Sequence, residues 1–142
     1  MMITLLALVT AAVFAGAAAY VGWSEQPARL ALDDDALLKE WKLSYARGTQ
    51  MQASLAVISG LLGLAAFYVE QHPLAAVGGI LMLANWPYTF LAIMPTNRRL
   101  GAMADGRAGA RPLIERWGRL HAVRTLLGFA ALCAFLFAQA AA

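Results

Sequence analysis

The sequence predicts an all-α integral membrane protein, a four-helix bundle that forms a single domain over residues 1–142. Of the 142 residues, 61% are hydrophobic and only 13% are charged, which is too little polar surface to cover a soluble domain of this size. Four apolar stretches are each long enough to cross a bilayer, which takes about 20 residues. They lie approximately at residues 3–24, 44–69, 74–94 and 117–138, and the connections leave no room for a second domain.

The first stretch, from Ile3 to Trp23, is interpreted as a retained span. A secretory signal peptide would carry a basic segment before its apolar run, and this stretch has none. Small residues such as Ala15 and Gly16 suit close packing between helices in lipid. We therefore count it as the first of four spans.

The second helix is expected to begin near Ala36, because the acidic run Asp33–Asp35 suits the N-terminus of a helix. If that helix continues to about Val69, it is about 50 Å long, so its first turns project from the hydrocarbon. Its early apolar side chains recur at helical spacing and predict a stripe that faces the bundle or the membrane interface: Leu37, Leu38, Trp41 and Tyr45.

Prolines mark the starts of the last two helices. Pro73 can open the third helix, and a mobile, basic loop is expected from Pro95 to Arg111. Pro112 can then open the fourth helix, which would present four residues on a single face: Trp117, His121, Arg124 and Gly128. The single cysteine, Cys133, excludes a disulfide within the chain.

The basic residues predict the orientation. With four spans, the first and third loops share one side of the membrane, and all 11 Lys and Arg residues lie in those loops, at their flanks or, for Arg124, just inside the last span. The positive-inside rule then places both loops in the cytoplasm and both termini outside, in a bacterial-type inner membrane. The basic residues are not interleaved with exposed aromatics on a soluble face, so no nucleic-acid partner is predicted.

All four helices bring polar side chains to the cytoplasmic end, where ionisable groups in a membrane are candidates for function. His121 is the candidate general base, and Glu25 or Arg124 can orient it. An enolate or phenolate can be stabilised by Arg47, Gln50, Asn97 and Arg124. Several candidates would bind a flat, hydrophobic substrate, with one of them, Asn85, at the floor of a cavity: Arg47, Gln50, Asn85, Trp86, Asn97 and Trp117.

A purely structural network remains an equal alternative, because buried polar groups in lipid need partners whatever their role. In that network Glu25 pairs with Arg124 or Arg47, and His121 hydrogen-bonds to Asn97. No metal site is predicted, since only His121 and Glu25 are plausible ligands at this level. No glycine-rich nucleotide motif or nucleophile elbow is present.

Four segments together resemble the anthrone-oxygenase-like family of small four-helix membrane proteins. The resemblance is to the bacterial branch of that family, which is largely uncharacterised. The four segments are residues 25–30 (EQPARL), Trp41 with Tyr45 and Gln52-Ala53, residues 95–100 (PTNRRL), and residues 117–125 (WGRLHAVRT). The resemblance implies oxidation of anthrones to anthraquinones with dioxygen as co-substrate and no added cofactor. A base that removes the acidic proton beside the anthrone carbonyl would generate a carbanion that reacts with dioxygen, and the pair His121 and Arg124 suits that step.

The favoured function is therefore a small membrane oxygenase or oxidoreductase for a hydrophobic, aromatic, anthrone-like substrate. Its expected partners are membrane lipids and that substrate, with homo-oligomer formation as a further option. One alternative is a non-catalytic membrane scaffold or subunit, whose small residues, including Gly60 and Gly63, would pack against another chain. Another is a lipid-, quinone- or haem-binding protein, with His121 as the axial ligand of a haem. Neither haem nor a metal is excluded by the sequence.

Overall fold

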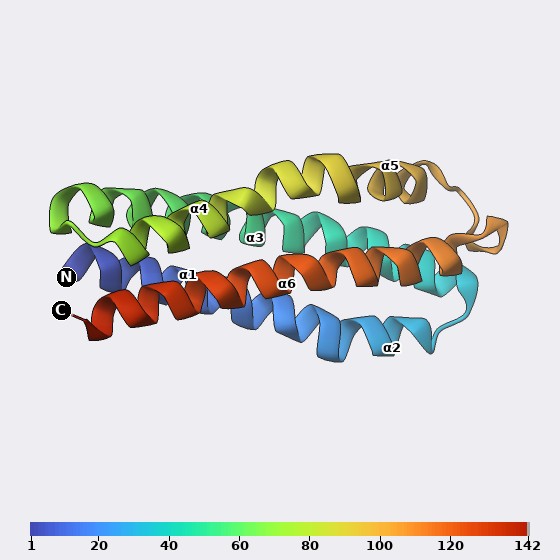
Figure 1. Ribbon diagram of the computed structural model, residues 1–142. Helices are drawn as coiled ribbons and strands as arrows, with labels where there is room; N and C mark the ends of the chain where they lie inside the picture. Colours follow the sequence, from blue (N-terminus) through green and yellow to red (C-terminus); the bar gives the residue numbers. More distant parts are fainter. Residues whose placement is uncertain (142) are drawn as a thin grey trace.

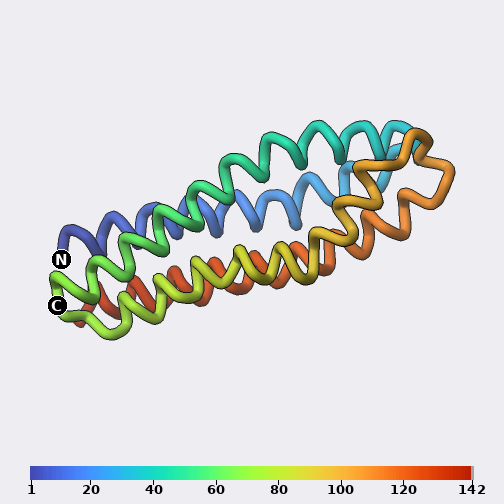
Figure 2. The backbone as a smooth tube through the Cα atoms, turned by 90° about the horizontal axis from the view of Figure 1, so that it is seen from above, coloured from blue at the N-terminus to red at the C-terminus, as the bar shows by residue number. Residues whose placement is uncertain are grey.

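The computed structural model describes residues 1–141 and confirms the all-α four-helix bundle, with no β-strand in that part of the chain. Four helical segments are each long and apolar enough to cross a membrane, which indicates a multi-pass membrane protein: Met2–Leu30, Asp34–Glu70, Pro73–Ala102 and Ala110–Ala140. Both termini and the turn between the second and third segments lie at one end of the bundle (Figures 1 and 2). The two other connections lie at the opposite end, which we call the polar end.

The first segment is longer than the expected span, which was placed at residues 3–24. It consists of α1 (Met2–Tyr20), a π-helical turn η1 (Val21–Glu25) and α2 (Gln26–Leu30). The expected loop after Trp23 was wrong because the helix continues through Pro27, which lies in the first turn of α2. Proline has no N–H to donate, and the helix passes this point directly after the wider π-helical turn.

Helix α3 (Asp34–Glu70) has 37 residues and is therefore about 55 Å long. It begins two residues before the expected Ala36, because Asp33 is its N-cap. The Asp33 carboxylate accepts hydrogen bonds from the N–H groups of Asp35 at 3.1 Å and Ala36 at 3.0 Å. The apolar stripe of this helix does face the bundle, with three of its side chains buried and the last half-buried: Leu37, Leu38, Trp41 and Tyr45.

The third segment consists of α4 (Pro73–Tyr88), a second π-helical turn η2 (Thr89–Ile93) and α5 (Met94–Ala102). The loop expected to begin at Pro95 was wrong over residues 95–102. Pro95 instead lies in the first turn of α5, directly after the wider π-helical turn η2, so the helix continues past the proline. The buried face of α5 is formed by Thr96, Asn97 and Leu100.

The remaining connection, residues 103–109, is tied to the start of α3. Its short 3-10 turn η3 (Gly106–Ala108) donates the Gly106 N–H to the Asp35 carboxylate at 3.0 Å. A Cβ atom at Gly106 would overlap the carbonyl oxygen of Asp34, so only glycine allows this approach. Helix α6 (Ala110–Ala140) then begins two residues before the expected Pro112, and Arg111 pairs with Asp34 at 2.8 Å.

The core has two parts with a polar region between them. One apolar cluster, rich in alanine, fills the end with the termini and includes Phe14, Met82 and Phe135. A second cluster, near the polar end, includes Trp41, Leu100 and other large side chains. The segments between the two clusters carry the polar side chains that form the candidate site.

Helices α3 and α4 approach most closely through glycines. A Cβ atom added at Gly63 would lie 2.7 Å from the Cα atom of Gly79, and one added at Gly79 would lie 2.8 Å from the carbonyl oxygen of Gly60. The alternative in which Gly60 and Gly63 pack against another chain is thus wrong in its geometry, because both residues pack against α4 of the same chain.

We expect the substitution Gly63→Leu to lower the midpoint of thermal unfolding in detergent. The larger side chain would force α3 away from α4, and overpacking of this kind costs about 1–3 kcal/mol. The matched control is Gly16→Leu in α1, where a Cβ atom meets nothing within 4 Å. An equal midpoint for the two variants would contradict the close approach of α3 and α4.

Candidate functional site

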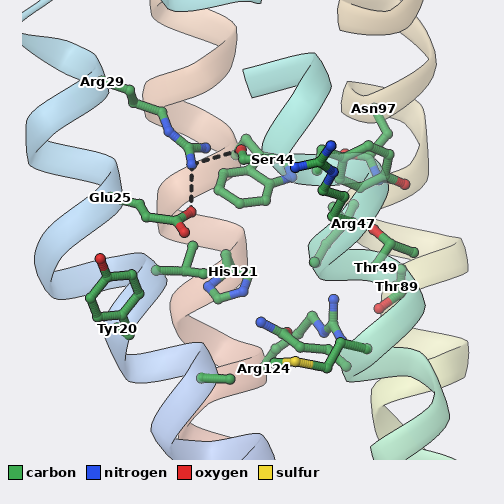
Figure 3. Close-up of a pocket in the computed structure, with 18 residues that line it drawn as sticks. Tyr20, Glu25, Arg29, Ser44, Arg47, Thr49, Thr89, Asn97, His121 and Arg124 are labelled. Atoms are coloured by element: carbon green, nitrogen blue, oxygen red, sulfur yellow. Dashed lines mark hydrogen bonds and ion pairs between the residues drawn. The ribbon is translucent and has the colours of Figure 1, made fainter. Parts of the chain in front are cut away.

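A cavity of about 420 Å³ lies between the four segments, at the level of the two π-helical turns. Small-molecule sites have volumes of about 300–1,000 Å³, so the cavity is large enough for a ligand of several rings. Figure 3 shows the first segment on one side, α3 on the other and α6 behind. The turn η1 contributes Val21 and Glu25, and η2 contributes Thr89 and Ile93.

The face of α6 that was predicted from helical spacing forms the rear of the cavity. Trp117, His121 and Arg124 are all buried and all line it. The rings of Trp117 and His121 are stacked, with centroids 5.0 Å apart and planes inclined by 27°. The imidazole is thus held in place by stacking, and no other described side chain hydrogen-bonds to its ring. Both the position and the orientation of His121 therefore leave its ring available to a ligand (Figure 3).

Arg124 is a buried cation without a counter-ion. Its exposed fraction is only 9%, and no carboxylate of residues 1–141 lies within ion-pair distance. Its guanidinium carbon lies 5.7 Å from the centre of the Phe14 ring, and its Nε atom has no hydrogen-bond acceptor. An uncompensated buried charge is costly. The side chain is accordingly suited to bind an anionic oxygen of a ligand in the cavity.

Arg29 is a site residue that the sequence analysis missed, because it was assigned to the first loop. Its side chain is 1% exposed and pairs with the carboxylates of Glu25 at 2.9 Å and Glu40 at 2.8 Å. It also donates a hydrogen bond to Ser44 Oγ at 3.0 Å and lies over the Trp117 ring at 5.4 Å. The spacing of Glu25 and Arg29, four residues apart, was the signal for a helical ion pair.

The pairings expected for a purely structural network were wrong. Glu25 pairs with Arg29, and Asn97 donates from Nδ2 to the hydroxyl oxygen of Tyr45 at 2.9 Å. The Tyr45 ring is in turn stacked on that of Trp41, with centroids 4.8 Å apart. Polar side chains do form a network here, but it leaves His121 and Arg124 outside.

Two buried amide oxygens at the cavity have no hydrogen-bond donor: Gln52 Oε1 and Asn97 Oδ1. Gln52 takes the place that was expected for Gln50, which is exposed and does not line the cavity. Two residues correspond to about 200° of rotation around a helix, so the two side chains lie on nearly opposite faces. A ligand with hydroxyl groups can satisfy both amide oxygens.

The other predicted binding residues occupy two different places. Arg47 is exposed and lines the edge of the main cavity. Asn85 and Trp86 instead line a second cavity of about 150 Å³ between α3 and the third segment. The two cavities share four lining residues, which lie where they adjoin: Tyr45, Thr49, Thr89 and Arg124.

No group of three or more His, Cys, Asp or Glu side chains within residues 1–141 is placed to hold a metal ion. The polar side chains that line the main cavity are instead a histidine, arginines, amides, hydroxyl groups and a paired glutamate. Such a set can accept a proton from a ligand and stabilise negative charge on an oxygen atom.

Comparisons of the sequence with known proteins find similarity to anthrone oxygenases. The family model described as anthrone oxygenase matches residues 41–134. An anthrone oxygenase of Claviceps purpurea is 36% identical over 110 residues, which cover 66% of this chain and 62% of the relative. Anthrone oxygenase tpcL of Aspergillus fumigatus is 38% identical over 103 residues, or 63% of this chain and 62% of the relative. The matches thus span less than two thirds of the length of these relatives. No solved structure matches the chain.

Proposed function

The chain belongs to the anthrone oxygenase family, and on that premise we propose that it is a membrane oxygenase for a hydrophobic, anthrone-like aromatic ketone. The observation that carries the proposal is that His121 and Arg124 line the same cavity. His121 provides a base, and Arg124 is a buried cation that has no carboxylate partner among the described residues. Oxidation of an anthrone through an enolate begins with removal of a proton by a base and is accelerated by a cation that stabilises the enolate oxygen.

The proposed reaction begins with proton transfer from the methylene carbon of the anthrone to His121. The electron pair left behind is delocalised onto the carbonyl oxygen, where the guanidinium of Arg124 stabilises the negative charge. The carbanion carbon then forms a bond to dioxygen, and the distal oxygen takes a proton to give a hydroperoxide. Loss of the second methylene proton and cleavage of the O–O bond yield the quinone and one water. Dioxygen is the only oxidant, and we propose no added cofactor.

The remaining side chains have binding roles in this proposal. Gln52 and Asn97 accept hydrogen bonds from hydroxyl groups on the substrate, through the oxygens that otherwise lack donors. Trp117 holds the His121 ring by stacking and presents an aromatic surface. Glu25 acts in its ion pair with Arg29, at the edge of the cavity.

The proposal is tested with purified protein in vesicles that contain anthrone. Oxygen uptake is followed with an electrode, and anthraquinone formation is followed by absorbance. One dioxygen consumed for each anthraquinone formed, at a rate well above that of empty vesicles, is the expected result. A rate equal to that of empty vesicles for anthrone and for hydroxylated anthrones would refute the function.

We also propose that the protein lies in a plasma membrane with the polar end in the cytoplasm. All Lys and Arg residues lie between residues 29 and 47 or between 98 and 124, toward that end. A reporter that is active only in the cytoplasm is expected to be active when inserted at Ala104 and inactive when fused to either terminus. Activity of a fusion at the C-terminus would show that the orientation is reversed.

A further inference from the structure

The main cavity has a mouth on the side of the bundle, between the first segment and α3. Its rim includes Tyr20, Arg47, Gly48 and Met51, and the side chains of Tyr20, Arg47 and Met51 are exposed. Gly48 leaves the rim open, because a Cβ atom at this position meets nothing within 4 Å. In Figure 3 the first segment and α3 stand on opposite sides of this mouth, with His121 and Arg124 behind it.

Along the bundle axis, the mouth is bounded at both ends by contacts between the same two segments. Toward the polar end, Arg29 bridges the gap through its hydrogen bond to Ser44 and its ion pair with Glu40. Toward the termini, the Ser59 hydroxyl donates to the carbonyl oxygen of Ala7 at 3.0 Å, and the helices are in contact. An opening thus remains at the side, between the Arg29 bridge toward the polar end and the Ser59 contact toward the termini.

The level of the mouth relative to a bilayer follows from the segment lengths. A hydrocarbon core about 30 Å thick takes about 20 helical residues. We count 20 residues along each segment, starting at the end of the bundle that holds the termini. The far boundary of the hydrocarbon core then falls near Val21, Gln50, Ala92 and Leu120. Two exposed aromatic rings of the first segment agree with this level, because Tyr20 is 59% exposed and Trp23 is 88% exposed, as is typical at membrane interfaces.

We propose that the substrate enters the cavity sideways from the membrane, through this mouth between the first segment and α3. The inference rests on the proposed function for the identity of the substrate, whereas the route rests on the side mouth of the cavity and on the bilayer level that the segment lengths imply. A flat, apolar molecule dissolved in the bilayer reaches the boundary level and passes Tyr20, Gly48 and Met51. Its reactive carbon then meets His121 without crossing the aqueous phase.

The route is tested by photolabelling with anthraquinone, which attaches to neighbouring C–H bonds when irradiated and needs no turnover. With the probe dissolved in phosphatidylcholine vesicles, adducts are expected in peptides that contain residues 17–21 and 44–52. The variant Gly48→Trp fills the mouth and is expected to lose most of these adducts. The matched control is Gly16→Trp, a lipid-facing glycine with equally open surroundings, and it should be labelled like the unmodified protein.

A sulfonated anthraquinone, which stays in water, separates the two possible routes. Little cavity labelling by this probe supports entry from the membrane. Equal labelling by both probes would overturn the proposal, as would unchanged adducts in Gly48→Trp. Cavity labelling without oxygen uptake on anthrone would refute the proposed function alone and leave the route standing.

Discussion

Replacing Arg124 with methionine is expected to lower kcat for anthrone oxidation about 100- to 1,000-fold, the usual effect of removing a group that stabilises an oxyanion. The same variant is expected to unfold at an equal or higher temperature. Arg124 has no carboxylate partner among residues 1–141, so its burial costs free energy that no ion pair offsets. Methionine keeps an unbranched apolar stem like that of arginine and removes the charge. Activity and thermal unfolding are measured on the same preparation.

The matched control is the second buried arginine at the cavity. Arg29→Met should lower the unfolding temperature, because it leaves Glu25 and Glu40 without their shared cation. The two substitutions are chemically identical, and their opposite effects on stability would separate a binding role from a structural one. A clear loss of stability in Arg124→Met would show that Arg124 holds the fold together, and the assignment of an oxyanion site would then be wrong.

The fold was largely predictable because lipid imposes simple constraints on a sequence. Hydrophobicity over about 20 residues identifies a span, and the four spans were confirmed as helices. The errors lay where a helix leaves the hydrocarbon. The segments expected to be loops after Trp23 and from Pro95 are helical instead, and Pro27 and Pro95 each lie in the first turn of a short helix that follows a π-helical turn. Such a turn shifts the hydrogen-bond pattern by one residue and has no clear sequence pattern of its own.

The candidate site was predictable in detail only where one helix carries it. Trp117, His121 and Arg124 were correctly assigned to one buried face, since that assignment needs only the helical period. Across helices the common level was predictable, since Glu25, Arg47 and Asn97 do line the same cavity, but the individual side-chain pairings were not. Gln50 was therefore chosen where Gln52 lines the cavity, and the partner of Glu25 was sought on α3 or α6 when it was Arg29, one turn away.

Replacing His121 with alanine is expected to lower kcat about 100- to 10,000-fold, the range for loss of a general base. The physical reason is that no other described side chain in the main cavity is an uncommitted base, since the Glu25 carboxylate is paired with Arg29. The control is His72→Ala at the opposite end of the bundle, which should keep full activity. Oxygen uptake with anthrone measures both variants.

Chemical rescue distinguishes a proton acceptor from a residue that only supports the cavity wall. The alanine variant leaves a space beside Trp117 where the imidazole ring was stacked. Added imidazole should enter that space and restore part of the activity of His121→Ala, while leaving the Arg124→Met variant unchanged. In the unmodified protein, anthrone deuterated at its methylene carbon should react more slowly if His121 removes that hydrogen in the slow step. Full activity in His121→Ala, with no response to imidazole, would rule out His121 as the base.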